Sequence, residues 1–187
     1  MKRSLPRFSR TLALAAPAVA LTTTRADAGI FMKADNLLGE SRTTTHKDWI
    51  EVISMAYGVK NTASLGAGGT GGIYPGKSEG GELSITKLLD SSSPALFLKC
   101  AKGEPILELK LEFEQVTSTM PAVYYRVTLT NVLVTKMEPD ARDNNRPSET
   151  VSFAYERIKV EYYKTDTKGG VPSTPTTTVN WDFVNNK

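Results

Sequence analysis

Eight consecutive residues in the middle of the sequence, LELKLEFE at positions 107–114, alternate apolar and charged side chains without a break. A period of two places all the apolar side chains on one face of a β-strand, so the segment predicts a strand with one face on a core and the other in water. Residues 123–136 repeat the alternation and extend it with β-branched valines. The chain is therefore expected to be mainly β, and the carboxylates of Glu108, Glu112 and Glu114 are expected to lie on a solvated strand face.

Residues 151–163 constrain the shape of the sheet. Their first apolar side chains, at 151, 153 and 155, have one parity, and the later ones, at 158, 160 and 162, have the other. A regular strand would turn the second set to the opposite face. We therefore expect a β-bulge near Glu156 and Arg157 that returns both sets to one face and bends the strand. Bent long strands favour a closed or nearly closed barrel.

Shorter patterns complete the expected sheet, with strands at residues 30–38, 49–59, 82–89 and 179–184. Residues 90–103 break the β pattern, because serines with Pro94 indicate a helix start and Gly103 indicates its end. One short helix is too few for the crossovers of a parallel sheet. The residues thus predict a closed or nearly closed β-barrel, with one short α-helix and a long glycine-rich loop at residues 60–81.

Residues 1–28 have the parts of a secretory signal peptide in order. Basic residues precede an apolar run over residues 12–21, and small residues at 26–28 provide a cleavage site. The apolar run has about ten residues, whereas a membrane-spanning helix needs roughly 20. We expect a leader cut after Ala28, a single domain over residues 29–187, and no membrane insertion. The alternative is a misassigned start, with Met32 as the first residue.

Removal of the leader changes the charge of the protein. It takes away five Lys or Arg and one Asp, so the net charge falls from +3 to −1. A nearly neutral protein has no electrostatic reason to bind nucleic acid or an anionic membrane, and neither is expected as a partner. Cys100 is the single cysteine, which excludes an intramolecular disulfide.

Residues 71–78, GGIYPGKS, match the phosphate-binding pattern G-x-x-x-x-G-K-[ST]. That loop needs a strand before it and a helix after it, so that backbone N–H groups point at the phosphate. Here glycines flank the motif on both sides, and Pro75 removes one N–H. We interpret the motif as part of the loop at 60–81, which holds eight of the fourteen glycines and is expected to be a functional arm or disordered. Lys77 then becomes a solvated loop charge or a partner contact.

The single histidine, His46, and the single cysteine, Cys100, form the sharpest enzyme hypothesis, a nucleophilic thiol with an imidazole base. Cys100, however, falls on the apolar face of the expected helix, where a free cysteine acts as a small hydrophobic residue. Trp49 and Trp181 lie in expected strands and are interpreted as core or interface anchors. We expect no catalytic, cofactor-binding or metal-binding residues and no cofactor.

Several runs resemble the haemolysin co-regulated protein (Hcp) family of the type VI secretion system, in order along residues 30–187. They are HKDWIEV at 46–52, SPALF at 93–97 with CAKG at 100–103, VLV at 132–134, ETVSFAYERI at 149–158, and WD with NNK at the end. The resemblance implies a compact β-barrel of two packed antiparallel sheets with one short α-helix on its side, and a structural role without an active site. It implies a homo-oligomer in which six copies form a ring and rings stack into a tube. It further implies sheath, spike and effector proteins as partners, with the ring released and able to carry effectors.

The leader-like segment leaves two interpretations open, because tube proteins of this family assemble in the cytoplasm and typically have no leader. The chain is either a tube component that assembles in the cytoplasm and is then secreted by the type VI system, or an exported Hcp-like binding protein. In the second interpretation the protein is secreted or periplasmic, and the glycine-rich loop at residues 60–81 binds its ligand. An enzyme built on Cys100 and His46 is the third hypothesis.

Overall fold

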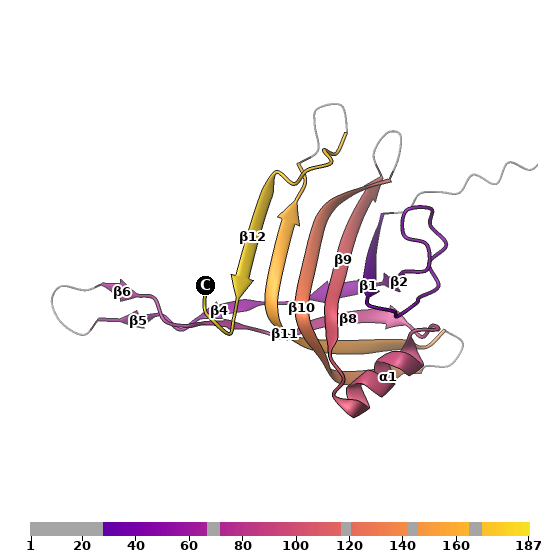
Figure 1. Cartoon of the computed structure of the whole chain (residues 1–187), viewed down its shortest axis with the longest axis horizontal. Coiled ribbons are helices and arrows are strands. Elements are labelled where there is room, and N and C mark those ends of the chain that lie inside the picture. Colours follow the sequence, from indigo (N-terminus) through magenta and orange to yellow (C-terminus); the bar gives the residue numbers. More distant parts are fainter. Residues whose placement is uncertain (1–27, 67–71, 117–120, 142–145, 165–169) are drawn as a thin grey trace, which may run out of the picture.

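One bent antiparallel sheet makes up most of the molecule (Figure 1). The computed structural model describes residues 28–66, 72–116, 121–141, 146–164 and 170–187. The expected leader therefore lies outside the described residues, except for Ala28. The strand order is β2-β1-β9-β10-β11-β8-β3, and β12 also pairs with β11. The bounds are β1 Gly29–Ala34, β2 Ile50–Val52, β3 Ser54–Ala56, β8 Leu83–Leu88, β9 Ile106–Val116, β10 Pro121–Asp140, β11 Ser148–Tyr162 and β12 Thr177–Asp182. All the strands predicted from sequence are present, although the segment expected at 49–59 is divided into shorter strands.

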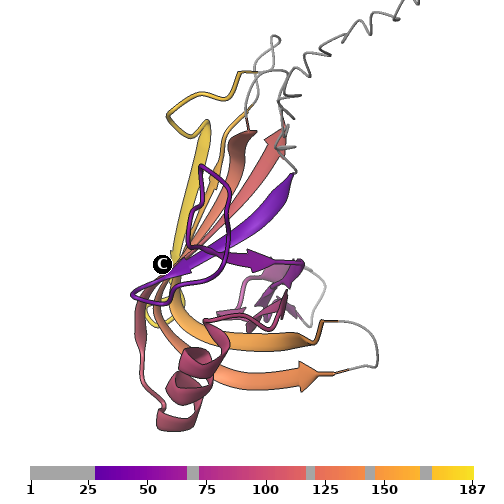
Figure 2. The ribbon, with the colours of Figure 1, turned by 90° about the vertical axis from the view of Figure 1, so that its right-hand side faces the viewer.

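The long strands β10 and β11 bend sharply, so that the two halves of the sheet face each other around a nearly closed barrel (Figure 2). The predicted barrel is thus confirmed, and its two layers are the two halves of one sheet. The bend explains why the apolar side chains of residues 151–163, in β11, change parity along the strand, and β10 shows the same effect. In β10, Leu129 and Val132 are both buried although three positions apart, and Asn131 between them has the left-handed φ of 53°.

The bulge predicted near Glu156 and Arg157 in β11 is wrong in its position. Pairing between β10 and β11 continues in one register from Tyr125 opposite Tyr162 to Val134 opposite Phe153, and shifts between Val134 and Lys136. The irregularity at the bend is Asn131 in β10, whose side-chain amide donates a hydrogen bond to the Glu156 carboxylate across the strands. Asn131, a residue of β10 with a left-handed backbone conformation, therefore produces the bend that we expected from an extra residue in β11.

The core fills the space between the two halves of the sheet. Its fully buried members come from every long strand, as Met32, Leu111, Leu129 and Phe153 illustrate. Helix α1, Ser93–Lys102, places Leu96 in this core and ends at Gly103, which has a φ of 62°. Phe97, the next residue of the helix, is 64% exposed.

The described part of the glycine-rich segment forms short paired strands. Strands β4, Val59–Asn61, and β7, Ser78–Gly80, pair with each other, as do β5, Ser64–Leu65, and β6, Ile73–Tyr74. We call residues 58–81 the arm. The described part of the arm extends away from the barrel as a narrow antiparallel ribbon (Figure 1).

Candidate assembly surface

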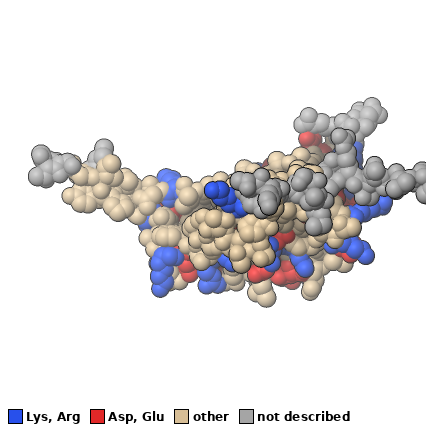
Figure 3. Space-filling model, turned by 90° about the horizontal axis from the view of Figure 1, so that it is seen from above, with Lys and Arg blue, Asp and Glu red and all other residues tan. Residues whose placement is uncertain are grey.

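The arm exposes large apolar side chains along its length. Val59, Ile73 and Tyr74 have exposed fractions of 68%, 74% and 59%. In the space-filling view, the arm is a mostly tan projection, whereas the blue and red side chains gather on the body (Figure 3). Apolar side chains concentrated on a projecting element mark a surface that another molecule covers.

Cross-strand hydrogen bonds hold the arm in its extended shape. The side-chain amide of Asn61 donates to the carbonyl of Gly76 at 3.1 Å, and the N–H of Gly76 donates back to the Asn61 side-chain oxygen at 3.0 Å. A β-carbon at Gly76 would lie 1.8 Å from the Thr62 carbonyl oxygen, so only glycine allows this close approach. Lys77 is exposed beside this pair. The motif at 71–78 is thus part of a β-ribbon, with Gly71 outside the described residues.

The first strand of the arm is attached to the barrel through two tyrosines. The hydroxyl groups of Tyr57 and Tyr125 lie 2.7 Å apart. Burial raises the pKa of Tyr125, and the hydrogen bond with Tyr57 raises it further, so the Tyr125 phenol stays neutral in ordinary buffers. The hydrogen bond joins Tyr57, directly before the arm, to a long strand of the sheet.

Three strands lie at the borders of the sheet. β2 and β3 end the strand order, and β12 pairs with β11 alone among the described strands. Val179 on β12 is 57% exposed. Open strand edges can pair with a strand of another molecule, so these borders are candidate contact surfaces.

A second exposed apolar area lies on the outside of the bend. Leu107 and Leu133 have exposed fractions of 68% and 42%. They line a cleft of 530 Å³ together with Pro105, Ala154 and other residues of β9 to β11. Leu107 is the first residue of the predicted alternation, and its side chain was therefore expected to face the core. The bend instead turns this side chain outwards.

The charged face of β9 is not solvated as predicted. Glu112 and Glu114 are only 8% and 4% exposed. Residues 35–49, which we call the covering loop, place the 1% exposed His46 over them. The His46 Nε2 atom lies 2.8 Å from Glu112 Oε2, and Nδ1 lies 3.2 Å from Glu114 Oε1, an ion-pair distance without hydrogen-bond alignment. The prediction was wrong for these two carboxylates, whereas Glu108 is exposed as expected.

Aromatic rings and an arginine complete this cluster outside the barrel. The His46 ring stacks on Phe31 at 4.3 Å and meets the edge of Trp49 at 4.6 Å. The Arg126 Nε group donates to Glu112 Oε1 at 2.7 Å. Burial by itself raises the pKa of Glu112, but the hydrogen bonds and charges of His46 and Arg126 outweigh it and lower that pKa below the ordinary 4.5. The cluster fixes the covering loop to the outer face of the sheet.

A sequence signal for this cluster exists in β1. Ile30, Phe31 and Met32 form a continuous apolar run instead of an alternation. Such a run is typical of a strand covered on both faces. In the structure Met32 enters the barrel core, while Phe31 on the opposite face packs under His46.

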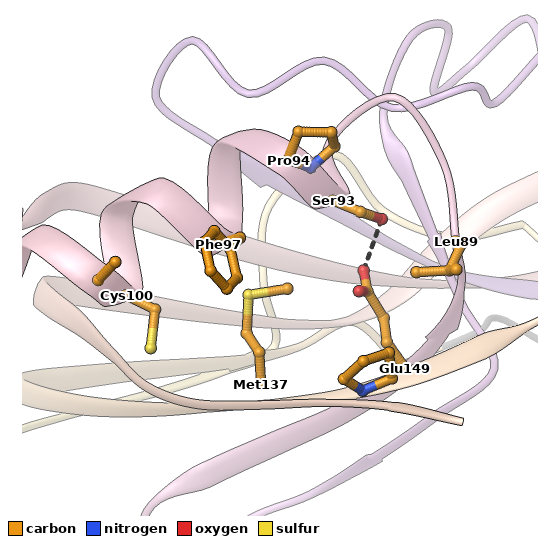
Figure 4. Close-up of a pocket in the computed structure, with 9 residues that line it drawn as sticks. Leu89, Ser93, Pro94, Phe97, Cys100, Met137 and Glu149 are labelled. Carbon is orange, nitrogen blue, oxygen red and sulfur yellow. Dashed lines mark hydrogen bonds between the residues drawn. The ribbon is translucent and has the colours of Figure 1, made fainter. Parts of the chain in front are cut away.

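The structure does not bring Cys100 to His46. Cys100 lies on α1 in a pocket of 360 Å³, facing Phe97 and Met137 (Figure 4). At one end of the pocket, Glu149 accepts hydrogen bonds from Ser93 at 2.7 Å and from the fully buried Lys87 at 2.8 Å. These bonds tie the start of α1 to the sheet.

Other classes of site also find no support within the described residues. No group of three or more His, Cys, Asp or Glu side chains there has an arrangement that could hold a metal ion. None of the described helices is both long and apolar enough to cross a membrane. What the described surface offers is the arm, the open edges and the apolar cleft, all of them suited to contacts with other proteins.

Comparison with known proteins agrees with this description. The model of the family described as "Type VI secretion system effector, Hcp" matches residues 31–162. Protein Hcp1 of Pseudomonas aeruginosa is 28% identical over 134 residues, which are 71% of this chain and 82% of that protein. A solved type six secretion system protein has a TM-score of 0.79 and 28% identity, and the match covers 86% of this chain and 99% of that one. Hcp1 from Salmonella typhimurium has a TM-score of 0.67 and 26% identity, with 86% and 97% of the two chains covered. The chain belongs to the Hcp family and is a structural tube component of the type VI secretion system.

Proposed function

We propose that six copies of this chain close into a ring, that rings stack into a tube, and that the assembled protein is secreted and can carry effectors. The observation that carries the proposal is the arm, with Ile73 and Tyr74 exposed at a distance from the barrel. An apolar projection of this kind requires a receiving surface. Another copy offers one in its open strand edges or in the cleft lined by Leu107 and Leu133.

The contact is of the head-to-tail type. The arm of one copy and the barrel of the next are different surfaces, so the interaction is heterologous, and it forms a ring when the rotation between copies closes. The protein then works without an active site or cofactor. Its partners are further copies of itself and the sheath, spike and effector proteins of the secretion system, and not nucleic acid or a membrane.

Light scattering on the purified protein tests the ring. The chain beginning at Gly29 and the full chain are measured over a range of concentrations. We expect a mass six times that of the protomer, and multiples of it where rings stack. A strict monomer at tens of micromolar would contradict the proposal.

A second candidate function rests on residues 1–28, all of which precede the family match at 31–162. In this alternative the segment is a cleaved leader, and the protein works as an exported interaction protein outside the tube. N-terminal sequencing of the native protein distinguishes the tube component from the exported interaction protein. A terminus at Gly29 would favour export, whereas a terminus at Met32 or an intact chain would favour cytoplasmic assembly followed by type VI secretion.

A further inference from the structure

Residues 182–187, which we call the closing turn, form a compact unit stabilised by its own hydrogen bonds. The N–H of Asp182 donates to the carbonyl of Lys187 at 2.8 Å, and the N–H of Lys187 donates back at 3.2 Å. The carboxylate of Asp182 accepts from the N–H groups of Val184 at 2.9 Å and Asn185 at 2.8 Å. The turn therefore holds its shape without help from the arm.

The closing turn is fixed to the barrel at the bend. The N–H of Phe183 donates to the carbonyl of Glu156 at 2.9 Å, and its ring meets the Tyr155 ring edge-on at 5.7 Å. Tyr155 itself packs against the core. The position of the turn is thus set by the body of the molecule.

The same turn contacts the second strand of the arm. Asn186 accepts a hydrogen bond from the N–H of Ser78 through its side-chain oxygen at 3.0 Å. A β-carbon at Gly80 would lie 3.0 Å from the Phe183 ring, so β7 and this ring are in close contact. In Figure 1 the C-terminal end of the chain lies where the arm leaves the barrel.

We propose that the closing turn sets the direction in which the arm extends from the barrel, with Asn186 and Phe183 as its positioning residues. Tyr57 and Tyr125 hold the chain at the start of the arm, and the closing turn holds the strand that returns. One attachment would let the ribbon swing about a pivot, whereas two attachments on different strands set its direction. The inference rests on the proposed function, in which the arm makes the contact between copies.

The length of the arm makes this direction important. Eight residues in extended conformation span roughly 25 Å at about 3.3 Å per residue. A rotation of about 10° at the root would then move the far end by roughly 4 Å, whereas two surfaces lose contact once the gap between them exceeds about 1 Å. A small loss of order at Ser78 is therefore enough to misplace Ile73 and Tyr74.

Two variants of Asn186 separate the hydrogen bond from the backbone shape. Asn186 has a φ of 53°, which glycine adopts freely and aspartate tolerates. Asn186→Gly keeps this conformation and removes the acceptor, whereas Asn186→Asp keeps both. Val184→Ala is the matched control, because Val184 is 64% exposed on the same turn.

The first measurement reports on the contact itself. Amide hydrogen exchange at Ser78 is followed in the full chain. We expect faster exchange in Asn186→Gly, and exchange as in the wild type in Asn186→Asp and Val184→Ala. The unfolding midpoint should stay within a few degrees in all of them, because the contact lies outside the core. Unchanged exchange at Ser78 in Asn186→Gly would overturn the inference.

The second measurement reports on assembly. We expect association between copies to weaken about fivefold or more in Asn186→Gly, the equivalent of one lost hydrogen bond at the root, and to recover in Asn186→Asp. Association equal to that of the wild type in Asn186→Gly, despite faster exchange at Ser78, would refute the positioning role. A wild-type protein that stays monomeric would instead refute the ring. Residual dipolar couplings of the arm in that monomer would then decide the inference, which fails if the arm of Asn186→Gly keeps its wild-type direction.

Discussion

Glu112 shows how one residue joins three elements. It belongs to β9, lies within hydrogen-bond distance of His46 in the covering loop, and accepts a hydrogen bond from Arg126 in β10. Two cationic or polar partners compensate for the removal of this carboxylate from water. The cluster therefore fixes the covering loop only while all its members are present.

His46→Ala should destabilise the protein by about 3 kcal/mol, because it removes one partner of the buried Glu112 carboxylate and leaves the buried Glu114 carboxylate beside an empty space. Urea unfolding measures this loss. Lys47→Ala is the matched control, since Lys47 is exposed beside His46, and it should change stability by no more than about 0.5 kcal/mol. A loss below about 1 kcal/mol in His46→Ala would show that the cluster does not hold the loop.

Glu112→Gln should reduce the acid sensitivity of the fold. The pKa of Glu112 in the folded protein lies below its ordinary 4.5, so the charged group contributes stability above pH 4.5 that is lost as the pH falls through the folded pKa. The difference in unfolding free energy between the wild type and Glu112→Gln should therefore shrink from pH 6 towards pH 3. Glu108→Gln, at an exposed position of the same strand, should show no such trend. If the difference in unfolding free energy stays constant or grows towards pH 3, the charge of Glu112 does not stabilise the fold in the way inferred here.

At this scale the sequence predicts the buried face of β9 but not the covering of its charged face. Leu109 and Leu111 are fully buried as the alternation requires. The covering loop has no apolar periodicity, and His46 and Glu112 are 66 positions apart. Tertiary contacts over such a separation leave no local pattern, apart from the continuous apolar run around Phe31.

Among the elements, the bent strands β10 and β11 depend on a single left-handed residue. The apolar pattern of β11 correctly predicted a change of direction near Glu156, since a period of two cannot otherwise keep both halves on the core. It could not identify the strand that carries the irregularity. Asn131 provides it in β10, because asparagine tolerates the left-handed region better than most residues.

Asn131→Ala should cost about 2 kcal/mol, from roughly 1 kcal/mol of backbone strain and about 1 kcal/mol for the lost hydrogen bond to Glu156. Asn131→Gly loses the same hydrogen bond but avoids the strain, so it should be the more stable of the two. Chemical denaturation of both variants measures the difference. An alanine variant as stable as the glycine variant would mean that the bend does not require this conformation.

The arm shows a second limit of pattern reading at this scale. Its paired strands have two or three residues each, too short for an alternation to be recognised. Glycine at position 76 is required there by the close approach of Thr62, whereas composition alone associates glycine with disorder. The sequence thus indicated where the arm lies in the chain, but it did not predict the paired strands that form it.

The described part of the molecule consists of a barrel with a hydrophobic core and an arm that contributes no residue to that core. No core residue of the described chain lies within residues 58–81. This division explains why the fold class could be predicted from the long strands alone. The cleft lined by Leu107 and Leu133 could not be predicted, because it forms from side chains that the bend brings together.

Replacing residues 59–80 by Asn-Gly should leave the barrel folded and abolish assembly. The N–H of Gly81 already donates to the carbonyl of Gly58 at 2.9 Å, which is the hydrogen bond that a two-residue hairpin turn makes. Unfolding free energy should change by less than about 1 kcal/mol, while light scattering should report a monomer. An arm-less chain that still forms rings, or that fails to fold, would contradict this separation of roles.

The continuity between arm and sheet has a mechanical consequence. The arm leads directly into β8, which runs antiparallel to β11 over six paired positions from Leu83 opposite Phe153 to Leu88 opposite Ser148. In Figure 1 the arm and β8 lie nearly along one line. Traction on the arm therefore loads these ladder bonds in shear, all at the same time, and not one after another as in unzipping. Because β11 is continuous through the bend, the force then spreads into the whole sheet through the backbone, and the barrel resists it as a unit.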